Sequence, residues 1–82
     1  MNALDELKNA FMEVLGISPR ADFGTLTYGQ TQGWDSVAHM ALIANIESRF
    51  DIMLPTDDVI GMSSFDKARE IVERHGVPVN AA

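Results

Sequence analysis

The sequence of 82 residues predicts an all-α fold, most simply a small four-helix bundle with a long first loop and a short third helix. Three observations favour this fold class. Apolar residues recur at spacings of three and four, which is the periodicity of amphipathic helices. No segment shows the alternation of apolar and polar residues that is typical of a strand. Glycine follows three of the apolar segments and marks helix ends, at Gly16, Gly61 and Gly76.

The first helix is predicted over residues 3 to 15. Its inward side is formed by Leu4, Leu7, Phe11, Val14 and Leu15. Residues 17 to 35 then form an unusually long connection, which needs anchors of its own in a compact domain. The apolar residues available as anchors are Ile17, Phe23, Leu26 and Tyr28. We expect an ordered loop with one helical turn near residues 20 to 25.

The second helix is predicted from Ser36 to Phe50 and has two apolar faces. At about 100° per residue, the bulkier face consists of His39, Leu42, Ile43, Ile46 and Phe50. The opposite face, which we call the strip, consists of Val37, Met40, Ala41 and Ala44. Because core residues are normally the bulkier ones, we expect the strip to face solvent or a partner. The alternative is that the long connection folds over the strip with Phe23, Leu26 and Tyr28.

A short third helix is predicted after Pro55, with Thr56 as its N-cap. Its buried side is expected to be Val59, Ile60 and Met62. A fourth helix over residues 65 to 75 is capped by Ser63 or Ser64, and its inward side is Phe65, Ala68, Ile71 and Val72. His75 lies in its last turn, where a cation is favourable. We expect a single domain over residues 1–82, with an ordered core over residues 3–76 and a flexible tail over residues 77–82.

The formal net charge is −6, from twelve acidic and six basic residues. Phosphate backbones and anionic lipids repel such a protein and basic protein surfaces attract it, so we do not expect it to bind nucleic acid. The same acidity is also typical of a small protein whose charge serves only to keep it soluble. No stretch approaches the roughly 20 apolar residues of a membrane span. The N-terminal residues lack a signal-peptide pattern, so we expect a cytoplasmic location.

Ser36 is the candidate functional residue, because it stands at the predicted start of the second helix, directly after Asp35. From position alone a structural role is the stronger interpretation, since either residue would cap the helix. Catalysis by Ser36 is not expected, because it lies outside a Gly-x-Ser-x-Gly motif and His39 is placed at the edge of the core.

A metal site is not expected either. A calcium loop starting at Asp51 would have Thr56 at the position that requires glycine. The chain has no cysteine, which excludes a thiolate zinc site and means that any thiol chemistry must come from a cofactor.

Two segments resemble the acyl carrier proteins. Gly33-Trp34-Asp35-Ser36-Val37 contains an Asp-Ser-Leu-like motif, and Ile46-Glu47-Ser48-Arg49-Phe50-Asp51-Ile52 is similar to the end of that family's second helix. The resemblance covers nearly the whole chain. It implies that Ser36 receives 4′-phosphopantetheine from coenzyme A through a separate phosphopantetheinyl transferase. The thiol of that arm would carry acyl groups as thioesters, and the protein itself would not be an enzyme. Because the chain starts at Met1 without flanking domains, we expect a free-standing carrier.

The second helix departs from the carriers of primary fatty-acid synthesis, which usually have several acids there. Here Glu47 is the only internal acid, and Arg49 opposes it. Trp34 resembles more closely the specialised carriers of lipid, polyketide or surface-polymer pathways. We expect a monomer that contacts the transferase and the acyl-loading and acyl-processing enzymes. The expected contact residues are Asp35, Val37, Met40, Ala41, Ala44 and Glu47.

Two alternatives stay open at this point. The protein could instead be an unmodified helical adaptor that binds partner proteins through the same strip. A set of flexible side chains in the core, Met12, Met53 and Met62, could shelter a carried acyl chain or simply fill gaps.

Overall fold

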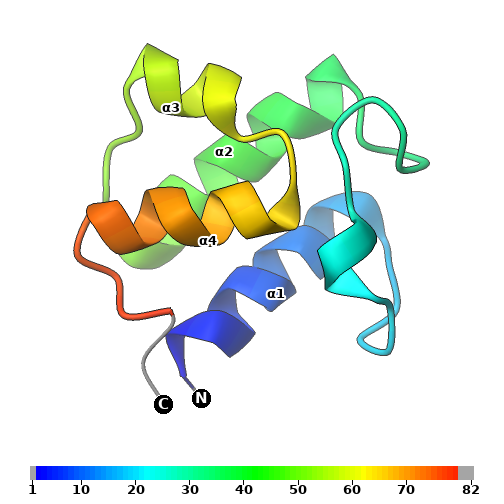
Figure 1. The fold of residues 1–82 in the computed structure, drawn as a ribbon, viewed down its shortest axis with the longest axis horizontal. Coiled ribbons are helices and arrows are strands. Elements are labelled where there is room, and N and C mark those ends of the chain that lie inside the picture. The colour runs from blue at the N-terminus through cyan, green and yellow to red at the C-terminus, as the bar shows by residue number, and fades with distance from the viewer. Residues whose placement is uncertain (1, 80–82) are drawn as a thin grey trace.

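The computed structural model describes residues 2–79, and within them it contains four α-helices and one 3₁₀ turn. The elements are α1 (Ala3–Leu15), η1 (Phe23–Thr25), α2 (Ser36–Phe50), α3 (Thr56–Gly61) and α4 (Phe65–Arg74), as Figure 1 shows. The described residues form no strand beyond one isolated antiparallel bridge between Thr27 and Ser64. The predicted all-α fold with a long first loop and a short third helix is confirmed.

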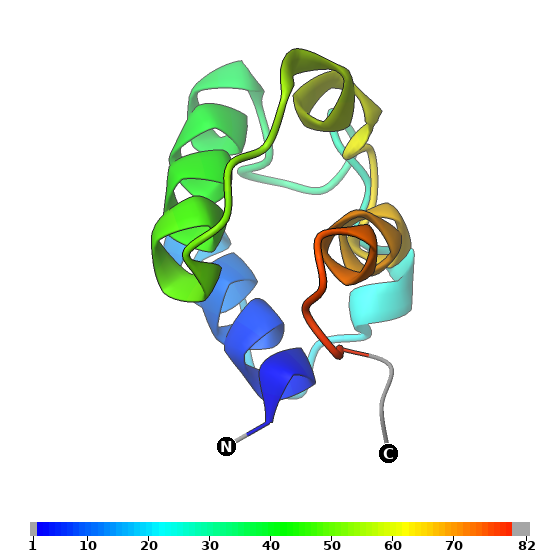
Figure 2. The same cartoon turned by 90° about the vertical axis from the view of Figure 1, so that its left-hand side faces the viewer.

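The helices enclose one core. In the view of Figure 2, α1 and α2 lie on one side, and α4 and η1 lie on the other with α3 above them. The interior is filled mainly by large apolar side chains, including Leu7, Phe11, Trp34, Leu42, Ile46, Phe65 and Val72. The inward faces predicted for the fourth helix and for most of the second are therefore buried, and Phe50 is only partly buried because it is the last residue of α2.

Each long helix begins and ends at a residue suited to that position. The Asn2 side chain accepts a hydrogen bond from the Asp5 N–H at 2.8 Å and caps α1. Gly16 ends α1, as predicted, and it does so in the left-handed conformation, with φ 67°. Asp51 ends α2 in the same way, with φ 54°, a conformation in which short polar residues are better tolerated than bulky ones. Ser64, one of the two predicted candidates, caps α4.

The long connection between α1 and α2 is ordered by contacts with α4 and with the segment before it. Phe23 in η1 packs against Phe65 at a centroid distance of 5.1 Å, and Leu26 is also buried. The backbone N–H of Tyr28 donates to the Ser63 carbonyl at 2.9 Å. The predicted helical turn near residues 20–25 is therefore present, and it anchors the connection on the side of the molecule formed by α4.

The short helix α3 differs from its prediction in two respects. Pro55, not Thr56, occupies the N-cap position, and no side chain caps the helix. Ile60, predicted to be buried, is 76% exposed, and no residue of α3 is fully buried. Six residues make too few turns to present a broad inward face, so Val59 alone packs against the core from α3, and Met62 is buried just after it.

Polar contacts also link α3 to the rest of the fold, in addition to its small apolar face. The Asp58 carboxylate contacts His75 Nε2 at 2.7 Å and Arg74 at 3.2 Å, which fastens α3 to the end of α4. His75 is the C-cap residue of α4, so it lies close to the position expected from the sequence.

The predicted flexible tail is wrong for residues 77–79. Val77 and Val79 are buried with the core, because the chain turns after Gly76 and runs back along it. Residues 80–82, the rest of the predicted tail, lie outside the described residues. Of the three methionines expected in the core, Met62 is fully buried, Met12 is partly buried and Met53 is exposed, because it lies in the open connection between α2 and α3.

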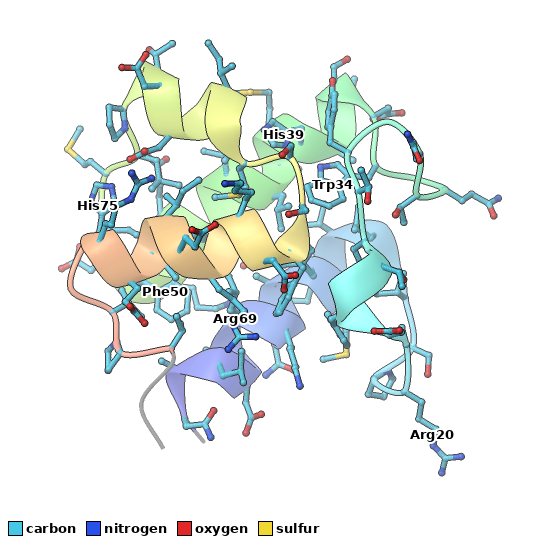
Figure 3. The ribbon with its side chains drawn as sticks, viewed as in Figure 1. Arg20, Trp34, His39, Phe50, Arg69 and His75 are labelled. Atoms are coloured by element: carbon cyan, nitrogen blue, oxygen red, sulfur yellow. The ribbon has the colours of Figure 1, made fainter. Side chains whose placement is uncertain are left out.

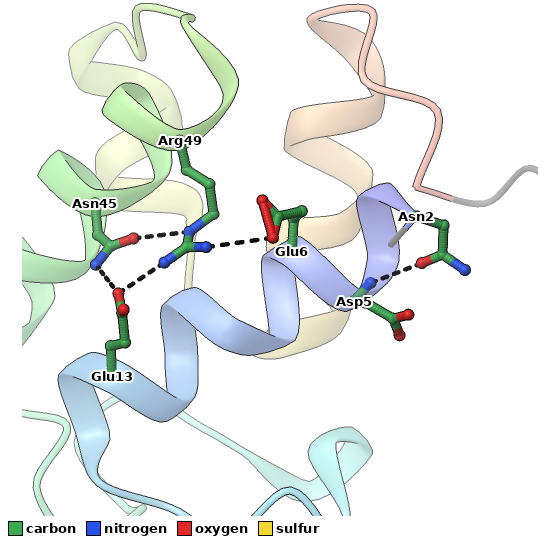
Figure 4. Close-up of polar contacts among 6 residues, drawn as sticks. All are labelled: Asn2, Asp5, Glu6, Glu13, Asn45 and Arg49. Atoms are coloured by element: carbon green, nitrogen blue, oxygen red, sulfur yellow. Dashed lines mark hydrogen bonds and ion pairs between the residues drawn. The ribbon is translucent and has the colours of Figure 1, made fainter.

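An ion-pair network joins α1 to α2 on the surface (Figure 4). Arg49 in α2 contacts Glu13 at 2.7 Å and Glu6 at 3.4 Å, and its Nε donates to the Asn45 side-chain oxygen. The Asn45 side-chain amide in turn donates to Glu13 at 2.9 Å. Arg49 is thus engaged with α1, whereas the sequence suggested that it opposes Glu47.

This network lowers the pKa of the Glu13 carboxyl below its ordinary value, first through the hydrogen bond from Asn45 and then through the charge of Arg49. A carboxyl whose pKa is lowered by folding stabilises the fold above its unfolded pKa, and this contribution is lost as pH falls through the folded pKa. We predict that Asn45→Ala raises the pKa of Glu13 toward the ordinary value. An NMR titration of the Glu13 side chain measures this, and an unchanged pKa would show that the amide contact is absent in solution.

Phe11 is predicted to contribute more to stability than Phe50, although the sequence places both on inward helix faces. It is fully buried, with edge-to-face contacts to Trp34 and Phe65 at 5.3 and 5.0 Å. Phe11→Ala should lower the free energy of unfolding by about 3–5 kcal/mol. Phe50→Ala should cost less, because Phe50 is only partly buried. Chemical denaturation of both variants measures the difference, and equal losses would contradict the burial described above.

Candidate functional site

The chain before α2 forms a compact turn, and this turn places the Trp34 side chain in the core. The Thr27 N–H donates to the Thr31 hydroxyl at 2.8 Å, and the Trp34 N–H donates to the Thr31 carbonyl at 3.1 Å. The Gly29 N–H closes the turn on the Trp34 carbonyl at 3.0 Å, and Gly29 and Gly33 both have positive φ. The Trp34 side chain is only 1% exposed. The residue that precedes Asp35 and Ser36 is therefore firmly anchored.

His39 makes two side-chain hydrogen bonds that determine its protonated nitrogen. The Trp34 indole N–H donates to His39 Nδ1 at 3.0 Å, and His39 Nε2 lies 2.8 Å from the Val59 carbonyl oxygen. An indole nitrogen can only donate and a carbonyl oxygen can only accept. Both bonds therefore require the neutral tautomer that carries its proton on Nε2. Figure 3 shows Trp34 and His39 close together, with His75 at the opposite side of the view.

Ser36 is the first residue of α2 and is exposed. The N-cap is Asp35, whose carboxylate accepts a hydrogen bond from the Ala38 N–H at 2.8 Å. Of the two capping candidates, Asp35 therefore has the structural role, and the hydroxyl of Ser36 is not needed for it. Both ring nitrogens of His39, one turn further along, are bound to Trp34 and Val59 and offer no base to this hydroxyl.

The strip is open to solvent along α2. Val37 is 79% exposed and Met40 is 57% exposed, and Ala41 and Ala44 are also exposed. The long connection does not cover it, because Phe23 and Leu26 are buried against the α4 side and Tyr28 packs on Trp34 and His39. The strip contains no charged residue, so its surface differs from the acidic character of the chain as a whole.

Glu47, predicted to contact partners, has a structural bond that the sequence did not indicate. Its carboxylate accepts a hydrogen bond from the Leu54 N–H at 2.8 Å, and the residue is partly buried. It thereby holds the connection between α2 and α3 in place.

A mainly apolar groove of about 270 Å³ lies between the long connection, α2 and the α3 region. It is lined by Tyr28, His39, Val59, Ile60, Met62 and Ser63. Sequence reasoning missed this groove, because its walls come from segments far apart in the chain. The only signal was the pair of apolar residues in the third helix region, Val59 and Ile60, close to a buried methionine.

Within residues 2–79, no three histidine, aspartate or glutamate side chains come together in a way that would hold a metal ion. In this same part of the chain, no helix combines the length and apolar character needed to cross a bilayer. No family model matches the sequence, and neither the curated proteins nor the solved structures give a match.

The exposure of the strip predicts how it tolerates charge. Met40→Glu and Ala44→Glu should each change the free energy of unfolding by no more than about 0.5 kcal/mol. Ile43→Glu is the matched control on the same helix: Ile43 is buried, and an unpaired buried carboxylate should destabilise the protein strongly. Thermal denaturation of the three variants measures this. A large loss of stability in either strip variant would place the strip inside the protein.

Proposed function

We propose that the protein is an acyl carrier protein in which Ser36 carries a covalent 4′-phosphopantetheine arm. The main support for this proposal is the difference in solvent exposure between Ser36 and two residues close to it, one on either side in the chain. Ser36 is exposed at the start of a 15-residue helix, whereas Trp34 before it and His39 after it are buried. Asp35 caps the helix, so the Ser36 hydroxyl is available for modification without loss of the cap.

The position also suits the group that would be attached. A phosphodiester on Ser36 would lie at the positive end of the α2 dipole, where an anion gains about 0.3–1 kcal/mol. In the transfer, the Ser36 oxygen forms a bond to the β-phosphorus of coenzyme A. The bond to the nucleotide phosphate breaks, adenosine 3′,5′-bisphosphate leaves, and the hydroxyl proton passes to a base of the transferase. The attached arm supplies the thiol that this cysteine-free chain lacks, and acyl groups are held on it as thioesters.

The strip is the proposed contact surface for the transferase and for the acyl-loading and acyl-processing enzymes. Its residues begin directly after Ser36 and are exposed, apolar and uncharged. Partners of this surface are recognised by apolar contact, with Asp35 adding charge at one end. This character, together with Trp34, favours a specialised lipid, polyketide or surface-polymer pathway over primary fatty-acid synthesis. The Met40→Glu and Ala44→Glu variants should accordingly be modified more slowly than the parent.

The second candidate is an adaptor that binds partner proteins through the same strip and receives no prosthetic group. The exposed apolar side chains of α2 favour it as much as they favour the carrier. The two candidates differ only at Ser36, so covalent modification of that residue separates them.

We predict that co-expression with a phosphopantetheinyl transferase of broad specificity adds one phosphopantetheine per chain, and that Ser36→Ala abolishes this gain. Ser36→Ala should change stability little, because Asp35 retains the cap. Ser48→Ala is the matched control, since Ser48 is an exposed serine near the other end of the same helix. Intact mass spectrometry measures the gain. An unmodified parent would favour the adaptor, and modification that persists in Ser36→Ala would refute the assigned site.

A further inference from the structure

Ser36 lies within residues 34–39, a segment that we call the bracket because the buried side chains at its two ends are bonded to each other. Trp34 is two residues before it and His39 three residues after it, and their side chains are joined by the indole-to-imidazole hydrogen bond of 3.0 Å. Trp34 is 1% exposed and His39 9% exposed. The bracket therefore fixes the backbone on both sides of an exposed serine from within the core.

Packing alone does not require this pair to be polar. Aromatic and aliphatic side chains would fill the same space without a directed bond, and the remaining core is almost entirely apolar. A hydrogen bond between two buried groups specifies one relative orientation, because a buried polar group left without a partner loses its bond to water and gains none in return. Residues beyond the bracket also fix its two ends. Phe11 and Tyr28 pack on Trp34, and the Val59 carbonyl of α3 accepts a hydrogen bond from His39.

Resting on the proposed function, we propose that Trp34 and His39 are positioning residues for the modification of Ser36. Their bond sets the path of the backbone through Asp35 and Ser36, so that the serine oxygen is presented to the transferase in one geometry. Group transfer depends steeply on such placement, and an error of about 1 Å can cost a factor of about 10² in rate. Neither side chain takes part in the transfer chemistry. Their effect passes through the backbone that they hold.

The test compares variants that remove or keep this bond. Trp34→Phe keeps an aromatic ring but loses the donor, and His39→Leu loses the acceptor. His39→Asn retains an acceptor near the Nδ1 position and serves as the conservative rescue. Val72→Ala, in α4, removes a fully buried apolar group away from the bracket and controls for lowered stability. Transfer of phosphopantetheine from coenzyme A is measured with each folded variant as the protein substrate.

Trp34→Phe and His39→Leu should lower kcat for transfer by about tenfold. KM should be unchanged, because the strip that the transferase contacts is intact. His39→Asn should recover most of the rate, and Val72→Ala should behave like the parent. The Ala38 amide, which reports the Asp35 cap, should exchange its hydrogen faster in Trp34→Phe than in Val72→Ala. If Trp34→Phe does not fold, the pair His39→Leu and His39→Asn carries the comparison.

The outcomes separate the two proposals. A parent protein that is modified, with equal kcat in all variants, overturns the positioning role and leaves the carrier function standing. The positioning role is also overturned if Val72→Ala loses as much rate as Trp34→Phe, since the loss then follows stability. A parent protein that is not modified at Ser36 overturns the carrier function, and the positioning role falls with it.

Discussion

The His39 side chain joins three parts of the chain through two hydrogen bonds. Nδ1 accepts from Trp34 at the end of the long connection, the ring belongs to α2, and Nε2 donates to the Val59 carbonyl in α3. The connection is long and α3 has no fully buried residue, so the position of each depends on its bonds to the rest of the fold. One neutral imidazole in a single tautomer therefore helps to determine where both lie relative to the helix that carries Ser36.

The sequence predicts well those elements that are determined by residues close together in the chain. Periodic apolar residues and the glycine at position 16 predict α1 correctly, and the bulkier face of α2 is buried except for its last residue. The exposure of Ser36 and of the strip also follows from spacing along one helix. The bond between Trp34 and His39, the groove, and the burial of Val77 and Val79 could not be predicted, because each depends on how distant segments pack. Ile60 was misassigned because a helix of six residues is too short for its apolar periodicity to identify the buried face.

The functional proposal depends on the residues around Ser36 and on how they pack. The structure supports it by separating two roles that the sequence could not separate. Asp35 caps α2, and this leaves the Ser36 hydroxyl free of a structural task. The carrier and the adaptor share the strip as their binding surface, so the chemistry at Ser36 alone distinguishes them.

The uncharged strip also bears on how copies of this protein behave at high concentration. An apolar surface that is open to partners is equally open to a second copy of the same chain. Each copy carries a formal charge of −6, so long-range repulsion opposes such encounters in dilute buffer. At physiological ionic strength the Debye length is about 8 Å, and the repulsion is largely screened beyond that distance. The net negative charge of the chain thus opposes self-association through the strip at low salt, and this opposition weakens as the salt concentration rises.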